Sequence, residues 1–165
     1  MDNELFTRIV NKYGDKIYTV ALHTVQNEVA AEDITQEVFI KIYKNYGSFR
    51  GDAKMSTWIY RITKNTCFNY LKREKKYREM DDIETMPSLG ENKTVEKEME
   101  KVYRHMDLHR AIGGLSPNLR LAISLYYFNS HSYEEVAAIM DIPLNTLKSH
   151  IYRAKKELAK RLELK

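Results

Sequence analysis

The sequence contains few of the residues and patterns that mark secreted and membrane proteins. Its 165 residues include a single cysteine, Cys67, so no disulfide can form within the chain, which fits a reducing compartment. No apolar run approaches the roughly 20 residues that a membrane-spanning helix needs. The N-terminal residues, MDNELF, lack the basic and then apolar layout of a signal peptide. We therefore expect a cytoplasmic protein.

Patterns typical of β-sheets and of enzyme sites are missing as well. The sequence has no strand-like alternation of apolar and polar residues, no internal repeat, no glycine-rich phosphate loop and no nucleophile elbow. His105 and His109 have the i, i+4 spacing of a metal-binding pair, but two ligands are too few for a structural zinc site. We therefore expect no catalytic activity, no metal and no other cofactor.

The net charge of +4 is distributed unevenly along the chain. Residues 51–80 carry eight basic and three acidic residues, and residues 108–165 carry nine and five. Between them, residues 81–107 carry four basic and eight acidic residues. Because attraction to phosphate grows with the local number of cations, the two basic blocks indicate two separate nucleic-acid contacts. The alternative is that each charged run is a solvated helix face.

The clearest local motif lies in residues 132–162. Ser132 and Glu135 have the spacing of a capping box that starts one helix, and Pro143 suits the first turn of a second. Apolar residues recur along the second helix at core-facing spacing: Leu147, Ile151, Ala154, Leu158 and Leu162. Its other face is polar and cationic: Asn145, Lys148, Ser149, Tyr152, Arg153, Lys156 and Lys160. This pattern is typical of a helix-turn-helix whose second helix enters the major groove of DNA.

Helical periodicity extends over almost the whole chain. Residues 5–25, whose apolar stripe is interrupted at Gly14, and residues 30–46 predict two helices. A loop spans 47–54, and a third helix, capped by Ser56, runs to about residue 79. A further helix opens at Ser116-Pro117. We predict an all-α fold of two small domains, residues 1–79 and 105–165, joined by a flexible linker over residues 80–104.

The third predicted helix carries an unusual mixture on one face. Aromatic, amide and basic side chains share that face: Trp58, Arg61, Asn65, Phe68 and Lys72. Aromatic rings stack on unpaired bases, and cations follow the phosphate backbone. The alternative for Trp58 is a place in the core, because tryptophan is well buried on average.

Taken in order, these motifs resemble a bacterial RNA polymerase sigma factor of the extracytoplasmic-function (ECF) group. The resemblance covers residues 5–75 and 107–162 and depends on the segment AEDITQEVFIKIYKNYGSFRGDAKMSTWIYRITKNTCFNYLKR and on the helix-turn-helix. It implies three partners: core RNA polymerase, contacted through the clamp helices of the largest subunit and the flap of the second-largest, promoter DNA, and an anti-sigma factor.

The resemblance also assigns roles to matching residues. It places polymerase docking on Asp33, Gln36, Glu37 and Phe39. It places minus-ten recognition, with capture of a flipped base, on Phe49, Arg50, Gly51, Asp52, Lys54, Trp58, Arg61, Asn65 and Lys72. It places minus-thirty-five recognition on Lys148, Ser149, Tyr152, Arg153 and Lys156. The docking face is acidic, which suits a protein partner better than DNA; a solvated helix start, where Glu32 and Asp33 favour the dipole, is the alternative.

The function implied is a specificity subunit that directs polymerase to promoters and assists DNA melting. A stand-alone helix-turn-helix regulator is the alternative, although residues 1–80 contain neither a sensor nor a dimerisation pattern. A regulator would bind its operator alone. Two tethered domains would bind weakly without polymerase, because ordering them costs free energy. Asp141 stands at a turn position where glycine is common, and aspartate tolerates left-handed conformations.

Overall fold

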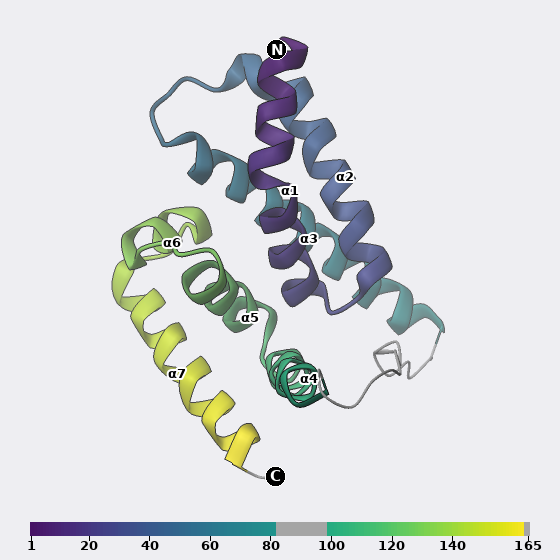
Figure 1. Cartoon of the computed structure of the whole chain (residues 1–165), viewed down its shortest axis with the longest axis vertical. Helices are drawn as coiled ribbons and strands as arrows, with labels where there is room; N and C mark the ends of the chain where they lie inside the picture. Colours follow the sequence, from purple (N-terminus) through teal and green to yellow (C-terminus); the bar gives the residue numbers. More distant parts are fainter. Residues whose placement is uncertain (82–98, 164–165) are drawn as a thin grey trace.

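The structure, a computed structural model, describes the backbone of residues 1–81 and 99–163 and the side chains of residues 1–80 and 106–163. Within these ranges the chain is helical and contains no β-strand, which confirms the all-α prediction. The elements are α1 (Asn3–Val25), α2 (Glu28–Asn45), the 3-10 turn η1 (Tyr46–Ser48), α3 (Met55–Asp81), α4 (Met99–Gly113), α5 (Pro117–Ile123), the π-helical turn η2 (Ser124–Phe128), α6 (Tyr133–Met140) and α7 (Leu144–Glu163). Helices α1–α3 form one layer and α4–α7 lie beside it (Figure 1).

The N-terminal helices form a small bundle with a continuous apolar centre. Asp2 caps α1 by accepting a hydrogen bond from the Leu5 N–H at 2.7 Å. The helix continues to Val25 through Gly14, where the sequence shows an interruption of the apolar stripe. Asn27 caps α2, on which Ile34, Val38 and Ile42 are buried as predicted.

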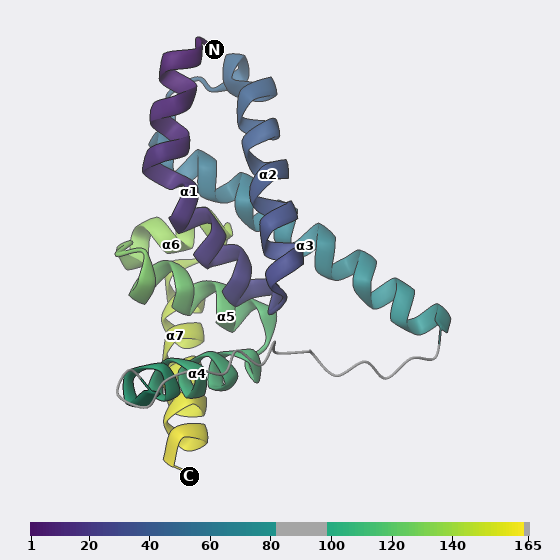
Figure 2. The same cartoon turned by 45° about the vertical axis from the view of Figure 1, so that its right-hand side comes forward.

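Helix α3 begins two residues earlier than the sequence suggested. It starts at Met55, so Ser56 lies inside the helix and is not its N-cap. Its C-terminal half projects beyond the bundle (Figure 2). Because α3 reaches Asp81 and α4 begins at Met99, both ends of the predicted linker range are helical. The rest of that range lies outside the described residues.

The helix-turn-helix has the predicted caps. The Ser132 hydroxyl accepts from the Glu135 N–H at 3.1 Å, and the Glu135 carboxylate accepts from the Ser132 N–H at 3.2 Å, which completes the capping box. Leu147, Ile151 and Ala154 bury one side of α7. Leu162 is exposed, contrary to the prediction, because the last turn of α7 runs past the helices that cover its start (Figure 1).

The two halves of the molecule are packed together. Helix α1 lies against α5 and η2, and α3 lies against α6, so that one apolar core runs through both (Figure 1). Arg120 of α5 donates from Nε to the carbonyl oxygen of Thr24 on α1 at 3.0 Å. We call this contact of α1 and α3 with α5, η2 and α6 the closed pairing. It brings the acidic first turn of α6 up to the basic helix α3.

Candidate functional site

The loop to which the resemblance assigns base capture is built on an aromatic stack. The Phe49 ring lies 5.2 Å from the ring of Trp58 on α3 and 6.4 Å from that of Tyr46. The Phe49 N–H also donates to the Tyr46 carbonyl oxygen at 3.0 Å. Gly51 has a φ of 77°, in the left-handed region that glycine adopts without strain. The loop therefore has a defined shape.

The residues of the candidate minus-ten set differ in exposure. Phe49 and Trp58 are half-buried. Trp58 packs against the core and also contacts the loop through Phe49, so it has features of both alternatives given for it above. The polar members of the set are exposed: Arg50, Asp52, Lys54, Arg61, Asn65 and Lys72. Since Trp58, Arg61, Asn65 and Lys72 are spaced by three, four and seven residues, α3 presents them on one side. On that side of α3, the Trp58 ring comes first along the chain, and the Arg61 and Lys72 cations and the Asn65 amide follow it.

Two members of this set are engaged by the other half of the molecule. Lys54 Nζ lies 3.0 Å from Glu135 Oε1, and this hydrogen bond is the main reason that the pKa of Glu135 is lowered. Arg61 Nε donates to the Ala138 carbonyl oxygen at 3.0 Å. The Lys54 side chain is 72% exposed, so its ion pair contributes at most about 1 kcal/mol. In the closed pairing, α6 covers part of the candidate minus-ten set.

The candidate docking residues lie on α2, and the structure adds apolar neighbours to them. Asp33 and Gln36 are exposed, and Phe39 is half-buried with its ring edge-on to Phe6 at 6.2 Å. Along the same helix, three large apolar side chains are also exposed: Val29 at 70%, Ile40 at 53% and Tyr43 at 48%. Sequence reasoning missed these three. Their helical spacing from Asp33 and Gln36, opposite the buried Ile34, Val38 and Ile42, was the available signal.

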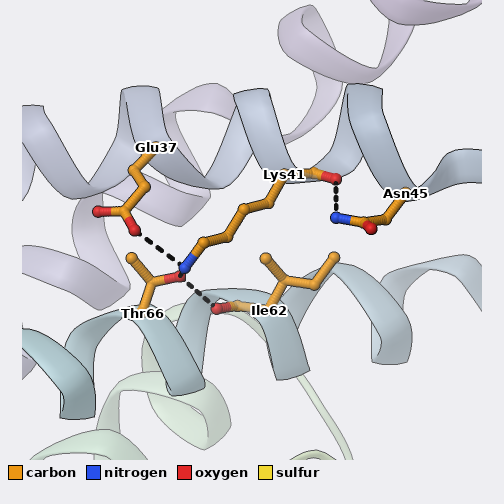
Figure 3. A network of polar contacts seen from close by, with 5 residues as sticks. All are labelled: Glu37, Lys41, Asn45, Ile62 and Thr66. Atoms are coloured by element: carbon orange, nitrogen blue, oxygen red, sulfur yellow. Dashed lines mark hydrogen bonds and ion pairs between the residues drawn. The ribbon is translucent and has the colours of Figure 1, made fainter.

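Glu37 has a different setting from Asp33. Its carboxylate lies 2.9 Å from Lys41 Nζ, which also donates to Thr66 Oγ1 of α3 at 3.1 Å (Figure 3). Thr66 in turn donates to the Ile62 carbonyl oxygen at 2.8 Å. Glu37 also borders an open groove between α2 and α3, whose other lining residues are Asn69, Lys72, Arg73 and Lys76. Lys41 thus ties the candidate docking helix to the candidate DNA-contacting helix.

The candidate minus-thirty-five residues form an open face on α7. All five are exposed: Lys148, Ser149, Tyr152, Arg153 and Lys156. They lie opposite Leu147, Ile151 and Ala154, which anchor the helix to the core. The Ser149 hydroxyl donates to the Asn145 carbonyl oxygen at 3.1 Å, so it faces a DNA partner as an acceptor.

An exposed aromatic patch near η2 was not predicted. The Tyr126 ring lies 4.6 Å from Tyr133 and 4.8 Å from Tyr127, and Lys155 Nζ lies 5.5 Å from the centre of the Tyr127 ring. Tyr127 and Phe128 are exposed. The run of three aromatic residues at 126–128 was the signal in the sequence. Exposed aromatic side chains gathered in this way are typical of a protein-contacting surface.

Nothing in the described part of the chain suggests a metal centre or a membrane segment. Among the described residues, no three His, Cys, Asp or Glu side chains are grouped so that they could hold a metal ion. His109 lies near His23, with ring centres 6.1 Å apart, and the His105 side chain lies outside the described residues. No described helix combines the length and the hydropathy that crossing a bilayer requires.

Comparison with known proteins identifies both halves of the chain. The sigma-70 region 2 family matches residues 9–77, and the sigma-70 region 4 family matches residues 105–158. RNA polymerase sigma-H factor of Pseudomonas aeruginosa is 34% identical over 170 residues, covering 98% of this chain and 88% of that protein. The chain belongs to the ECF sigma factors of the sigma-70 family. ECF RNA polymerase sigma-E factor of Escherichia coli K12 is 32% identical over 175 residues, with the same coverage.

Solved structures share the fold of this ECF sigma factor. The sigma factor RpoE of Bartonella quintana, in complex with the anti-sigma factor NepR, superposes with a TM-score of 0.81 at 22% identity over 96% of each chain. CnrH, in complex with the cytosolic domain of CnrY, gives a TM-score of 0.71 at 19% identity, over 99% of this chain and 90% of that one. As a member of this family, the protein directs RNA polymerase to promoters and is not an enzyme. The stand-alone regulator is not favoured.

Proposed function

We propose that this sigma factor acts in the cytoplasm and captures a flipped minus-ten base with the Phe49–Lys54 loop and Asn65. The observation that carries this proposal is the packing of Phe49 on Trp58, on the side of α3 that presents the exposed amide of Asn65 two turns further along the helix. Because the Phe49 and Trp58 rings are already packed together, these side chains lose less conformational entropy when a nucleobase binds to them. The Asn65 amide can both donate to and accept from a base edge. These contacts offset the few kcal/mol that flipping a base costs.

Exposed surfaces on α2 and α7 suit the contacts with polymerase and with the minus-thirty-five element. The α2 stripe of Val29, Asp33, Gln36, Ile40 and Tyr43 combines apolar area with negative charge, which suits a protein partner such as the polymerase clamp helices. The α7 face carries cations, a hydroxyl and a phenol, which suit the edges and phosphates of duplex DNA at the minus-thirty-five element. Tyr127 and Phe128 are the candidates for contact with the flap.

Control by an anti-sigma factor is part of the same proposal. The two solved structures named above are complexes with NepR and with CnrY. Among the described residues, the α2 stripe and the aromatic patch near η2 are two exposed surfaces with several apolar side chains, and such a partner could cover them.

Replacing Asn65 tests the base-capture role. Asn65→Ala should leave binding to core polymerase intact and lower open-complex formation by about tenfold or more, since a lost base contact costs ~1–3 kcal/mol. Permanganate reactivity of promoter thymines measures the opening. Asn69→Ala, at an exposed asparagine one turn further along α3, is the matched control. Normal thymine reactivity in the Asn65 variant would exclude the assigned role.

Removing negative charge from α2 tests the docking surface. Asp33→Ala combined with Glu37→Ala should weaken association with core polymerase by about tenfold, because loss of two interface carboxylates costs ~1–2 kcal/mol. The affinity is measured by titrating core enzyme with labelled sigma factor. A Glu4→Ala, Asp15→Ala variant changes the same charge on α1 and should bind normally. If both double variants bind alike, the α2 face is not the docking site.

A further inference from the structure

Three of the five histidines gather where the two halves of the molecule meet. His23, near the end of α1, is buried, and its Nδ1 forms a hydrogen bond with Ser124 Oγ of η2 at 2.9 Å. Its ring lies 4.6 Å from that of Phe128 and 6.1 Å from that of His109 on α4. His131, before α6, packs edge-on against Tyr60 of α3 at 4.7 Å. Histidines therefore occupy the closed pairing from both sides.

We infer that the closed pairing is a proton-sensitive latch, in which protonation of His23, His109 and His131 separates the two halves and uncovers Lys54 and Arg61. Only the role given to Lys54 and Arg61 in binding DNA rests on the proposed function. The latch itself depends on the geometry of the interface. The same interface holds the Lys54–Glu135 ion pair and the Arg61–Ala138 hydrogen bond, so opening it releases both side chains.

The surroundings of His23 disfavour a positive charge. The groups that face it are the His109 ring from α4, the Ser124 hydroxyl and the Phe128 ring from η2. The Arg120 guanidinium of α5 donates to the carbonyl oxygen of the next residue in α1, Thr24. Burial, followed by the neighbouring His109, lowers the pKa of His23 to about 4.

The other two histidines are closer to carboxylates, but burial still dominates. Burial lowers the pKa of His109, although Glu28 of α2 opposes the shift. Burial likewise lowers the pKa of His131; its hydrogen bond to the Leu125 carbonyl and the charge of Glu135 raise it, and Lys16 of α1 lowers it. The packing of the two halves therefore favours the neutral form of all three rings.

The direction of the pH dependence follows from these shifts. A histidine that is freed by opening recovers an ordinary pKa near 6.5. The closed pairing therefore has its full stability above about pH 6.5 and loses it as the pH falls toward 4. For His23 alone, lowering the pH from about 7.5 to about 5.5 raises the ratio of open to closed molecules about tenfold.

Hydrogen exchange of the full chain tests the latch without polymerase or promoter, so its failure would leave the sigma assignment untouched. Exchange of peptides from the end of α1 and from α5–η2, normalised to buried peptides of α2, should show protection falling by at least about tenfold from about pH 7.5 to 5.5, since His109 and His131 add to the contribution of His23. His23→Asn with His109→Asn and His131→Asn keeps an amide near each Nδ1 position and removes the titration, so its normalised protection should not change with pH. His150→Asn, on α7, is the control and should respond like the unmodified protein.

Two results would overturn the latch. One is an unchanged normalised protection between about pH 7.5 and 5.5 in the unmodified protein; the other is an unchanged pH response in the triple asparagine variant. If the triple variant fails to fold, ring-proton titration of the unmodified protein by NMR decides. The His23 resonance should stay that of a neutral ring at about pH 5.5, and titration of His23 near pH 6.5 would contradict the inference.

Discussion

Asp141 shows how a single residue shapes the helix-turn-helix. It ends α6 with a φ of 55°, in the left-handed region that side chains with a Cβ adopt at a cost. Its N–H donates to the Ala137 carbonyl oxygen and closes the helix end. The sequence had indicated a turn at this residue, and the expectation that aspartate would tolerate the left-handed conformation is confirmed.

Replacing Asp141 by glycine should stabilise the protein. Asp141→Gly removes the strain of the left-handed conformation and should raise the free energy of unfolding by about 0.5–1 kcal/mol, or the midpoint of thermal unfolding by a few degrees. Asp141→Ala removes the carboxylate but keeps the Cβ, so it should be no more stable than the original protein. Equal stability of the glycine and alanine variants would show that backbone strain is not the cause.

At the scale of the helices, two serines at N-cap positions differ in what they do. Ser132 accepts a hydrogen bond from the Glu135 N–H, whereas Ser116, the N-cap of α5, makes no such bond with its side chain. The sequence predicted a cap at both. The difference could not be foreseen, because it depends on the side-chain rotamer at each helix start.

This difference gives a matched pair of variants. Ser132→Ala should lower the free energy of unfolding by about 1 kcal/mol, since it removes the capping bond of α6. Ser116→Ala should have a clearly smaller effect. Chemical denaturation followed by circular dichroism measures both, and equal losses in the two variants would contradict the assignment of the capping box.

At the scale of the whole molecule, the two halves share one apolar core. We therefore expect them to unfold together. Trp58, the single tryptophan, reports on the N-terminal half, whereas far-ultraviolet circular dichroism reports on every helix. At about pH 7.5 the two signals should give the same denaturation midpoint. Separate midpoints at that pH would show that the closed pairing is too weak to make the two halves unfold in one transition.

Much of the fold was predictable because helical periodicity and caps are local. The buried Ile34, Val38 and Ile42 and the capping box at Ser132 were found from spacing alone. The start of α3 was misplaced at Ser56, because a serine inside the first turn resembles a cap in the sequence. The exposed Val29, Ile40 and Tyr43 were overlooked, because an apolar residue in a helical pattern is more often buried than exposed.

By itself, the sequence determined the helices, their inward faces, the turn at Asp141 and the family, because each depends on the identity and spacing of neighbouring residues. The tertiary structure alone decided which helices of the two halves meet. It placed His23 beside Ser124, Tyr60 beside His131 and Lys54 beside Glu135, residues that are between 71 and 101 positions apart. Such contacts depend on how whole surfaces fit together, and no short stretch of sequence encodes that fit.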